Sequence, residues 1–278
     1  MTNAAEHLGL DPATPLVIVT ADELGFGFAS NEGVRRSLDH GAATSAGLMV
    51  PAPWARAASA AYRGQDVGVS LTLNAEHDLY RWGPITHAPS LLDGDGGFPR
   101  TPADLWDHAD VDEVRRELRA QLERAVLWGF DVSHISSHLE AAVMRPEFFD
   151  VVLDLALDYS LALRLPNEDV QDDAGFPFRQ LALDEGVAIP DRVVMFRGPS
   201  APDVLQAIAD LEPGVTELVL RPAVDTDELR AQTTDADERV AHLAALCSGE
   251  FADALSARGA HRIAWRDLRA LQRSRHDW

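Results

Sequence analysis

The chain has 278 residues, a length that suits one large α/β domain and is short for two catalytic domains. Its 45 acidic and 24 basic residues give a formal net charge of −21, which would repel nucleic acid and anionic membrane surfaces, so we expect neither as a partner. Every basic residue is an arginine, and the lack of lysine excludes Schiff-base, pyridoxal-phosphate and P-loop chemistry.

The single cysteine, Cys247, excludes an internal disulfide and a cysteine zinc cluster. No basic region followed by an apolar stretch opens the chain, and no run approaches the ~20 apolar residues of a membrane span. These features predict a cytoplasmic protein that takes a small-molecule substrate. A homodimer is expected on the ground that many single-barrel proteins form dimers.

Short β-branched runs alternate with longer amphipathic stretches, a pattern typical of repeated strand–helix units around a parallel sheet. In chain order, we expect strands at residues 16–20, 46–50, 67–73, 132–137, 163–165, 193–196 and 216–220. The clearest helices are expected at 112–128, 146–158, 201–211 and 235–246, and residues 262–271 should form a short strand followed by a helix.

These units predict a single α/β domain over residues 1–278, folded as a distorted or incomplete (β/α) barrel; a doubly wound open sheet is the alternative. Residues 74–102, between the third strand and the next helix, should form a long loop rich in Gly and Pro. Loops of that length usually cover or build a site. We therefore expect the site at the carboxyl ends of the strands, with this loop against it.

Two adjacent acids end the first strand. Asp22 and Glu23 lie at the edge where barrel enzymes carry catalytic groups, and an acid pair there can divide into a base and a metal ligand. An equally weighted alternative is that one of them caps the next helix. Gly25 and Gly27 do not begin a dinucleotide loop, because the third glycine of that motif would fall on Ser30, so no nucleotide cofactor is expected.

The fourth strand carries two histidines. If the chain stays extended, His134, Ser136, His138 and Glu140 project to one side, because side chains alternate along a strand. His138 and Glu140 could then reach one metal ion together. A histidine beside an acid at the end of a barrel strand is a stronger ligand candidate than a lone histidine.

The roles of Arg221, His87 and the remaining histidines depend on the surroundings of each side chain. Arg221 follows the seventh strand, where its charge faces either a cleft or a surface ion pair. His87 lies within the long loop and is an open case. The remaining histidines, among them His242, are in helical or terminal stretches and are expected to be solvated.

Together these strand ends resemble the YdjC-like carbohydrate deacetylase family, from about residue 16 to residue 271. The matching segments are Thr-Ala-Asp-Glu-Leu-Gly at 20–25, Asp-Val-Gly-Val-Ser-Leu-Thr-Leu at 66–73, Ser-His-Ile-Ser-Ser-His at 133–138, Thr-Glu-Leu-Val-Leu-Arg-Pro at 216–222 and Trp-Arg-Asp-Leu at 265–268. The resemblance implies a distorted (β/α) barrel that uses magnesium or zinc to remove acetyl groups from N-acetylated sugars. It also implies that Asp22 is the general base and that Glu23 and His138 are metal ligands.

Four positions depart from the family pattern. Glu23 stands where the family favours aspartate, Ser70 where it has a second metal-binding histidine, and Ser136 where it has an aspartate. Serine is a poor substitute for imidazole, so metal affinity should be weak or absent unless Glu140 supplies a third ligand. Arg221 stands where the family has a histidine that can donate a proton, and arginine holds its own proton too tightly for that role.

Three hypotheses follow. The first is a hydrolase of the deacetylase class with a degenerate metal site. The second is a metal-independent enzyme on the same barrel, in which Arg221 and Arg164 hold an anionic small molecule while Asp22 or His138 handles a proton. The third is a non-catalytic protein that keeps the cleft to bind a ligand. The candidate substrate-binding residues are Ser70, Ser136, Glu140, Arg164 and His87.

Overall fold

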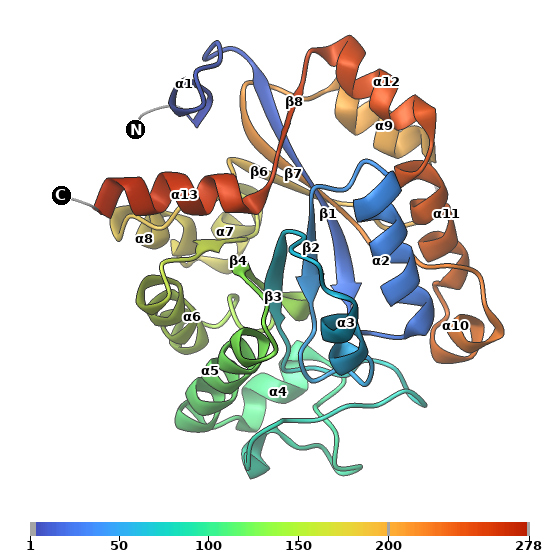
Figure 1. Cartoon of the computed structure of the whole chain (residues 1–278). Helices are drawn as coiled ribbons and strands as arrows, with labels where there is room; N and C mark the ends of the chain where they lie inside the picture. The colour runs from blue at the N-terminus through green and yellow to red at the C-terminus, as the bar shows by residue number, and fades with distance from the viewer. Residues whose placement is uncertain (1–3, 199–200, 277–278) are drawn as a thin grey trace.

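The apolar runs of the sequence form parallel strands that curl into a half-barrel. The computed structural model describes residues 4–198 and 201–276, and its sheet has the order β5-β4-β3-β2-β1-β7-β6, with β8 paired to β1 (Figure 1). The strands are β1 (Pro15–Leu24), β2 (Ser45–Leu48), β3 (Val67–Leu71), β4 (Val132–Ser137), β5 (Ala162–Leu163), β6 (Arg192–Met195), β7 (Gly214–Leu220) and β8 (His261–Ile263). The prediction of a single α/β domain with an incomplete (β/α) barrel is confirmed.

Helices follow the strands and cover the outer side of the sheet, with α2 and α11 at one side and α5 and α6 at the other (Figure 1). They are α1 (Ala4–His7), α2 (Phe28–His40), α3 (Ala55–Ala61), α4 (Pro102–His108), α5 (Val111–Leu127), α6 (Pro146–Asp158), α7 (Glu168–Ala174), α8 (Phe178–Asp184), α9 (Ala201–Ala209), α10 (Asp227–Gln232), α11 (Ala236–Leu246), α12 (Gly249–Arg258) and α13 (Trp265–His276). Two 3₁₀ turns, η1 (Pro89–Leu91) and η2 (His138–Glu140), complete the described elements. Pro146 starts α6 as predicted.

The two edges of the half-barrel, β5 and β6, are joined by a side chain instead of a strand pair. The amide of Asn167, just after β5, donates from Nδ2 to the carbonyl of Val193 at 2.9 Å and accepts from the Val193 N–H at 2.8 Å. One asparagine thereby satisfies both backbone groups of Val193, as a neighbouring strand would.

Polar groups gather on the inner side of the sheet toward its carboxyl edge, above an apolar cluster that includes Leu16 and Ile18, whereas the outer side packs apolar residues against the helices. Val17 and Val19 of β1 pack in one cluster with residues of α9, α11 and α12. Toward the inside, the imidazole of His134 stacks on the indole of Trp265, with ring centroids 4.4 Å apart and an interplanar angle of 13°. The centre of the half-barrel is therefore occupied by groups that need hydrogen-bond partners, and the site is built on them.

The segment between β3 and α4 contains only η1 and packs against the carboxyl edge of the sheet. The Tyr80 hydroxyl donates to the carbonyl of Phe26 at 2.6 Å, and the Trp82 indole donates to the carbonyl of Asn74 at 2.9 Å. The first contact holds the loop beside the end of β1, and the second joins two parts of the loop. Across the described residues, no helix has both the length and the apolar character needed to cross a bilayer.

Candidate active site

A bulge at the end of β1 turns two consecutive acids toward the mouth of the half-barrel. The register of β1 on β2 shifts between Ala21 and Leu24, and Glu23 adopts a left-handed conformation with φ of 63°. A bulge of this kind re-aims side chains that would otherwise alternate. Neither acid caps α2, because the N-cap residue is Gly27 and it has no side-chain cap bond.

Asp22 is tied to a buried arginine. Arg164, which follows β5, donates from Nη1 to Asp22 Oδ2 at 2.8 Å and makes a two-point ion pair with Glu217 of β7 at 2.8 and 2.6 Å. Glu217 Oε1 also accepts from the Thr20 hydroxyl at 2.5 Å and from the Trp265 indole at 3.0 Å. These bonds fix one oxygen of Asp22 and balance the charge of Arg164 inside the protein.

Glu23 lies in a cluster of buried arginines and acids. Arg239 of α11 donates from Nη1 to Glu23 Oε2 at 2.5 Å, and Arg221 Nη1 lies 3.6 Å from Glu23 Oε1. Asp235 forms ion pairs with both arginines, and Glu238 pairs with Arg221. Burial alone would raise the pKa of Glu23, but Arg239 and Arg221 lower it to about 2. Glu23 is therefore a carboxylate whose negative charge is already balanced by protein cations.

His138 is paired with a residue from the long loop. Its Nε2 donates to Glu76 Oε2 at 2.9 Å, and Glu76 Oε1 lies 3.4 Å from His77 Nε2. Burial alone would lower the pKa of His138, but the Glu76 carboxylate and its hydrogen bond raise it above the ordinary value. Burial likewise disfavours the charged form of Glu76, yet His138 holds the pKa of Glu76 below its usual range. The pair resembles an acid–base dyad in its geometry.

We expect Glu76→Gln to lower the pKa of His138, because the variant keeps the burial and removes the negative charge. The raised folded-state pKa contributes stability that is complete below the unfolded value of about 6.5 and is lost as the pH rises through the folded pKa. In the variant this contribution should disappear. Titration of the His138 imidazole by NMR measures the shift. Glu147→Gln on α6, whose carboxylate pairs with Arg145, is the matched control and should leave His138 unchanged.

Ser70 and Ser136 occupy neighbouring inner positions on β3 and β4. They are partners in the register of these two strands. A methyl group added to Gly47 would lie 2.0 Å from Asp22 Oδ1 and 3.8 Å from Ser70 Cβ, so Asp22 and Ser70 share this side of the sheet. Ser136 Oγ is buried and has no hydrogen-bond partner among the residues the structure describes. Small hydroxyl groups therefore occupy the part of the barrel interior next to Asp22.

Glu140 does not follow the alternation expected from an extended chain. Strand β4 ends at Ser137, and the next turn places Leu139 and Glu140 at φ of 51° and 58°. Glu140 instead lines a narrow cleft with Arg164. Burial raises the pKa of its carboxyl, while Arg197 and Arg164 act in the opposite direction. Its charged neighbours are thus arginines and not the other acids of the site.

Two further histidines differ in burial, since one is exposed and the other is buried. The side chain of His87 is exposed, and only its backbone carbonyl is bonded, by Arg116 Nη2 at 3.0 Å. The prediction that His242 is solvated is wrong: it is buried, and its Nδ1 accepts from the backbone N–H of Arg221 at 3.1 Å. Helix α11 turns this histidine inward against the end of β7.

Sequence reasoning missed several residues of the site: Glu76, Glu217 and Arg239, together with Asp235 and Glu238 that pair with the arginines. One signal was available for Glu217, because a lone acid within the apolar run of a central strand must find a buried partner. Glu76 lies in a loop, and Arg239 lies on an amphipathic helix where an arginine is ordinarily solvent-exposed.

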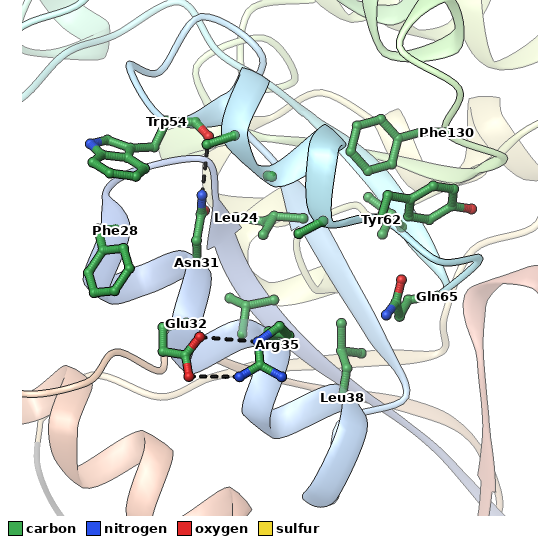
Figure 2. Close-up of a pocket in the computed structure, with 15 residues that line it drawn as sticks. Leu24, Phe28, Asn31, Glu32, Arg35, Leu38, Trp54, Tyr62, Gln65 and Phe130 are labelled. Carbon is green, nitrogen blue, oxygen red and sulfur yellow. Dashed lines mark hydrogen bonds and ion pairs between the residues drawn. The ribbon is translucent and has the colours of Figure 1, made fainter.

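A separate apolar pocket of about 260 Å³ lies outside the barrel between α2 and α3 (Figure 2). Two side-chain amides line it, and both are already bonded: Asn31 accepts from the Gly25 N–H at 2.7 Å and donates to the Trp54 carbonyl at 3.1 Å, while Gln65 accepts from the Arg63 N–H at 2.8 Å and donates to Asp39 at 3.5 Å. Glu32 and Arg35 pair with each other beside it. A sugar needs free donors and acceptors, so this pocket is not the candidate site. The larger apolar side chains that line it include Phe28, Leu38, Trp54, Tyr62 and Phe130.

A model of one protein family matches this chain. The family model described as YdjC-like protein matches residues 16–257, most of the chain. The chain belongs to the YdjC-like family. The resemblance carried by its strand-end motifs is thereby confirmed.

Relatives in the YdjC-like family cover nearly the whole chain. A protein of Thermus thermophilus named carbohydrate deacetylase is 31% identical over 95% of this chain and 97% of its own. A Geobacillus stearothermophilus protein of the same name is 31% identical over 91% and 98%. A solved structure from Enterococcus faecalis, described as a "putative cellobiose-phosphate cleavage protein", has a TM-score of 0.81 at 25% identity over 92% and 99% of the two chains.

The residues of this YdjC-like chain do not fit the divalent metal that the family resemblance implies. Both oxygens of Glu23 face arginines, His138 Nε2 is engaged by Glu76, and Ser70 offers no imidazole. Within residues 4–198 and 201–276, no group of three or more His, Cys, Asp or Glu side chains is arranged to hold a metal ion.

Proposed function

We propose that this YdjC-like protein recognises a carbohydrate at the carboxyl edge of its half-barrel and that its metal centre is degenerate. The relatives named carbohydrate deacetylases support the substrate class. One observation carries the loss of the metal centre: Glu23, the position of a family ligand, is held by Arg239 at 2.5 Å and by Arg221 at 3.6 Å. A carboxylate oxygen that accepts a short bond from a guanidinium is not free to bind a cation.

The remaining groups provide neither the metal ion nor the general acid that the family resemblance implies for acetyl removal. Arg221 stays protonated at all accessible pH values, and its acidic neighbours raise its pKa further against the effect of burial, so it cannot protonate a leaving amine. One oxygen of Asp22 is fixed by Arg164, and the other accepts from the Glu23 N–H at 3.1 Å, which leaves its second lone pair to orient a water or a sugar hydroxyl. The loss of a general acid alone reduces a rate by a factor of about 10² to 10⁴.

We expect the purified protein to contain no stoichiometric zinc or magnesium and to release acetate from N-acetylated chitooligosaccharides at least about a hundredfold more slowly than the Thermus thermophilus relative. Metal analysis and an acetate assay, run on both proteins under one set of conditions, measure this. Binding of the same oligosaccharides is followed by calorimetry and should persist. Stoichiometric metal together with fast deacetylation would refute the proposal.

A second candidate function is metal-independent proton transfer on a bound sugar derivative. The observation that favours it is the 2.9 Å contact between Glu76 and His138, which keeps His138 charged to a higher pH than a free histidine. Turnover that survives chelation and is lost in both Glu76→Gln and His138→Asn would support this function. The anionic substrate suggested by the sequence has no support from Arg164 or Arg221, because carboxylates of the protein already pair with both.

A further inference from the structure

We infer that Arg239 on helix α11 is the residue that excludes a divalent cation from this site, because its guanidinium binds Glu23 where a metal ion would. The inference rests on the proposed degenerate metal centre and names its cause. It differs from the sequence-based explanation, in which the missing histidine at Ser70 is the main defect. Arg239 lies outside every motif that carries the family resemblance.

Arg239 is fixed and cannot move aside without losing several contacts. Its side chain is 1% exposed, and its Nε donates to Asp235 Oδ1 at 2.6 Å. The guanidinium carbon lies 4.8 Å from the centre of the Phe26 ring, within the range of a cation–π contact. Its backbone carbonyl accepts from the N–H of Ala223, which ties this turn of α11 to the segment after β7. The arginine is therefore held against Glu23 from three directions.

The cluster already holds two cations beside Glu23, and these would repel a dication. Arg239 and Arg221 contribute two positive charges, which face the carboxylates of Glu23, Asp235 and Glu238. Two guanidinium groups thus bring the same charge as one divalent ion. A metal ion bound to Glu23 would lie within a few ångströms of both and would be repelled in a site with little water to screen them.

Repair of the metal site should require replacement of Arg239 in addition to restoration of the family residues. Restoring the family residues with Ser70→His, Ser136→Asp and Arg221→His leaves Arg239 on Glu23 Oε2, so this triple variant should still bind Zn²⁺ weakly. Adding Arg239→Met releases the carboxylate. We expect the quadruple variant to bind Zn²⁺ at least about tenfold more tightly than the triple variant, the scale on which groups around a metal ligand change affinity.

Calorimetric titration with Zn²⁺, and the visible spectrum of bound Co²⁺, measure this without reference to activity. The quadruple variant should also unfold at a lower temperature without Zn²⁺ and recover when Zn²⁺ is added, because the ion replaces the lost positive charge. Arg239→Gln in the same background is a second version that keeps polarity if the methionine variant folds poorly. Arg239→Lys keeps the charge and should bind no better than the triple variant.

Arg179→Met is the matched control, since Arg179 is also a buried arginine but bonds only to backbone carbonyls between β5 and β6. In the triple background it should leave Zn²⁺ affinity unchanged. Tight binding by the triple variant itself, equal gains from the Arg179 and Arg239 changes, or weak binding by folded Met and Gln variants would each overturn the role of Arg239. The proposed function fails by a different result, namely stoichiometric metal and fast deacetylation in the unmodified protein.

Discussion

Arg164→Met should lower the free energy of unfolding by about 3–5 kcal/mol, because it leaves two buried carboxylates without their cation. Arg164 holds Glu217 through two bonds and Asp22 through one, and Glu217 is fully buried. Methionine fills a similar length of apolar space but supplies none of these donors. The remaining donors to Glu217, from Thr20 and Trp265, are neutral and cannot balance its charge.

Urea unfolding at neutral pH measures this loss. The control is Arg115→Met, which breaks an ion pair with Asp154 in which both side chains are largely exposed, and it should cost less than about 1 kcal/mol. The double variant Arg164→Met/Glu217→Met should recover part of the loss, because it removes the stranded charge together with its partner. A cost for Arg164→Met no greater than that of Arg115→Met would contradict the buried ion-pair network.

Gly68→Ala should also destabilise the protein strongly, by about 1–3 kcal/mol or more, because it overpacks the barrel interior. A methyl group at Gly68 would lie 2.3, 2.4 and 2.5 Å from Nδ1, Cε1 and Cγ of His134. Such similar distances to three ring atoms mean that the methyl group would press on the face of the imidazole. The Trp265 indole stacks on one face of this imidazole. Gly68 therefore lies against the other face.

The imidazole cannot yield, since the indole blocks movement on one side and the Ser133 hydroxyl lies 3.0 Å from its Nδ1. Thermal unfolding compared with Gly94→Ala provides the measurement, because a methyl group at Gly94 meets nothing within 4 Å. The Gly94 variant should unfold like the parent. Equal stability of the two variants would mean that His134 has room to move, against the packing described here.

Local sequence patterns predicted the strands and the four helices expected at 112–128, 146–158, 201–211 and 235–246 to within a few residues, but they gave no range for α2 or α12. Residues 132–137 and 146–158 form β4 and α6 at the expected boundaries, since apolar periodicity and a first-turn proline are both local signals. The first strand extends beyond the expected residue 20 to Leu24, because its end contains two buried acids, Asp22 and Glu23, that interrupt the apolar pattern. Short helices such as α3 and α7 have too few turns to show a clear period.

The site was predictable only where it lies on strand ends. Asp22, Glu23 and His138 follow directly from strand positions, since the carboxyl ends of parallel strands meet at one edge. Their partners are distant in sequence: Arg164 is 142 residues from Asp22, and Arg239 is 216 residues from Glu23. Such pairs leave no trace in local periodicity. The bulge that aims both acids inward also depends on the pairing of β1 with β2.

Two residues at the start of α13 bind parts of the sheet that are synthesised long before them. The Trp265 indole donates a hydrogen bond to Glu217, and the backbone N–H of Trp265 donates to the Ser45 hydroxyl at 3.2 Å. The next residue, Arg266, donates twice to Asp66 Oδ2, at 2.8 and 3.0 Å. Ribosomes deliver these two residues after every strand has been made. The bonds from Trp265 to Glu217 and from Arg266 to Asp66 can therefore form only after all the strands have been synthesised, whereas Arg164, made earlier, can pair with Glu217 before them.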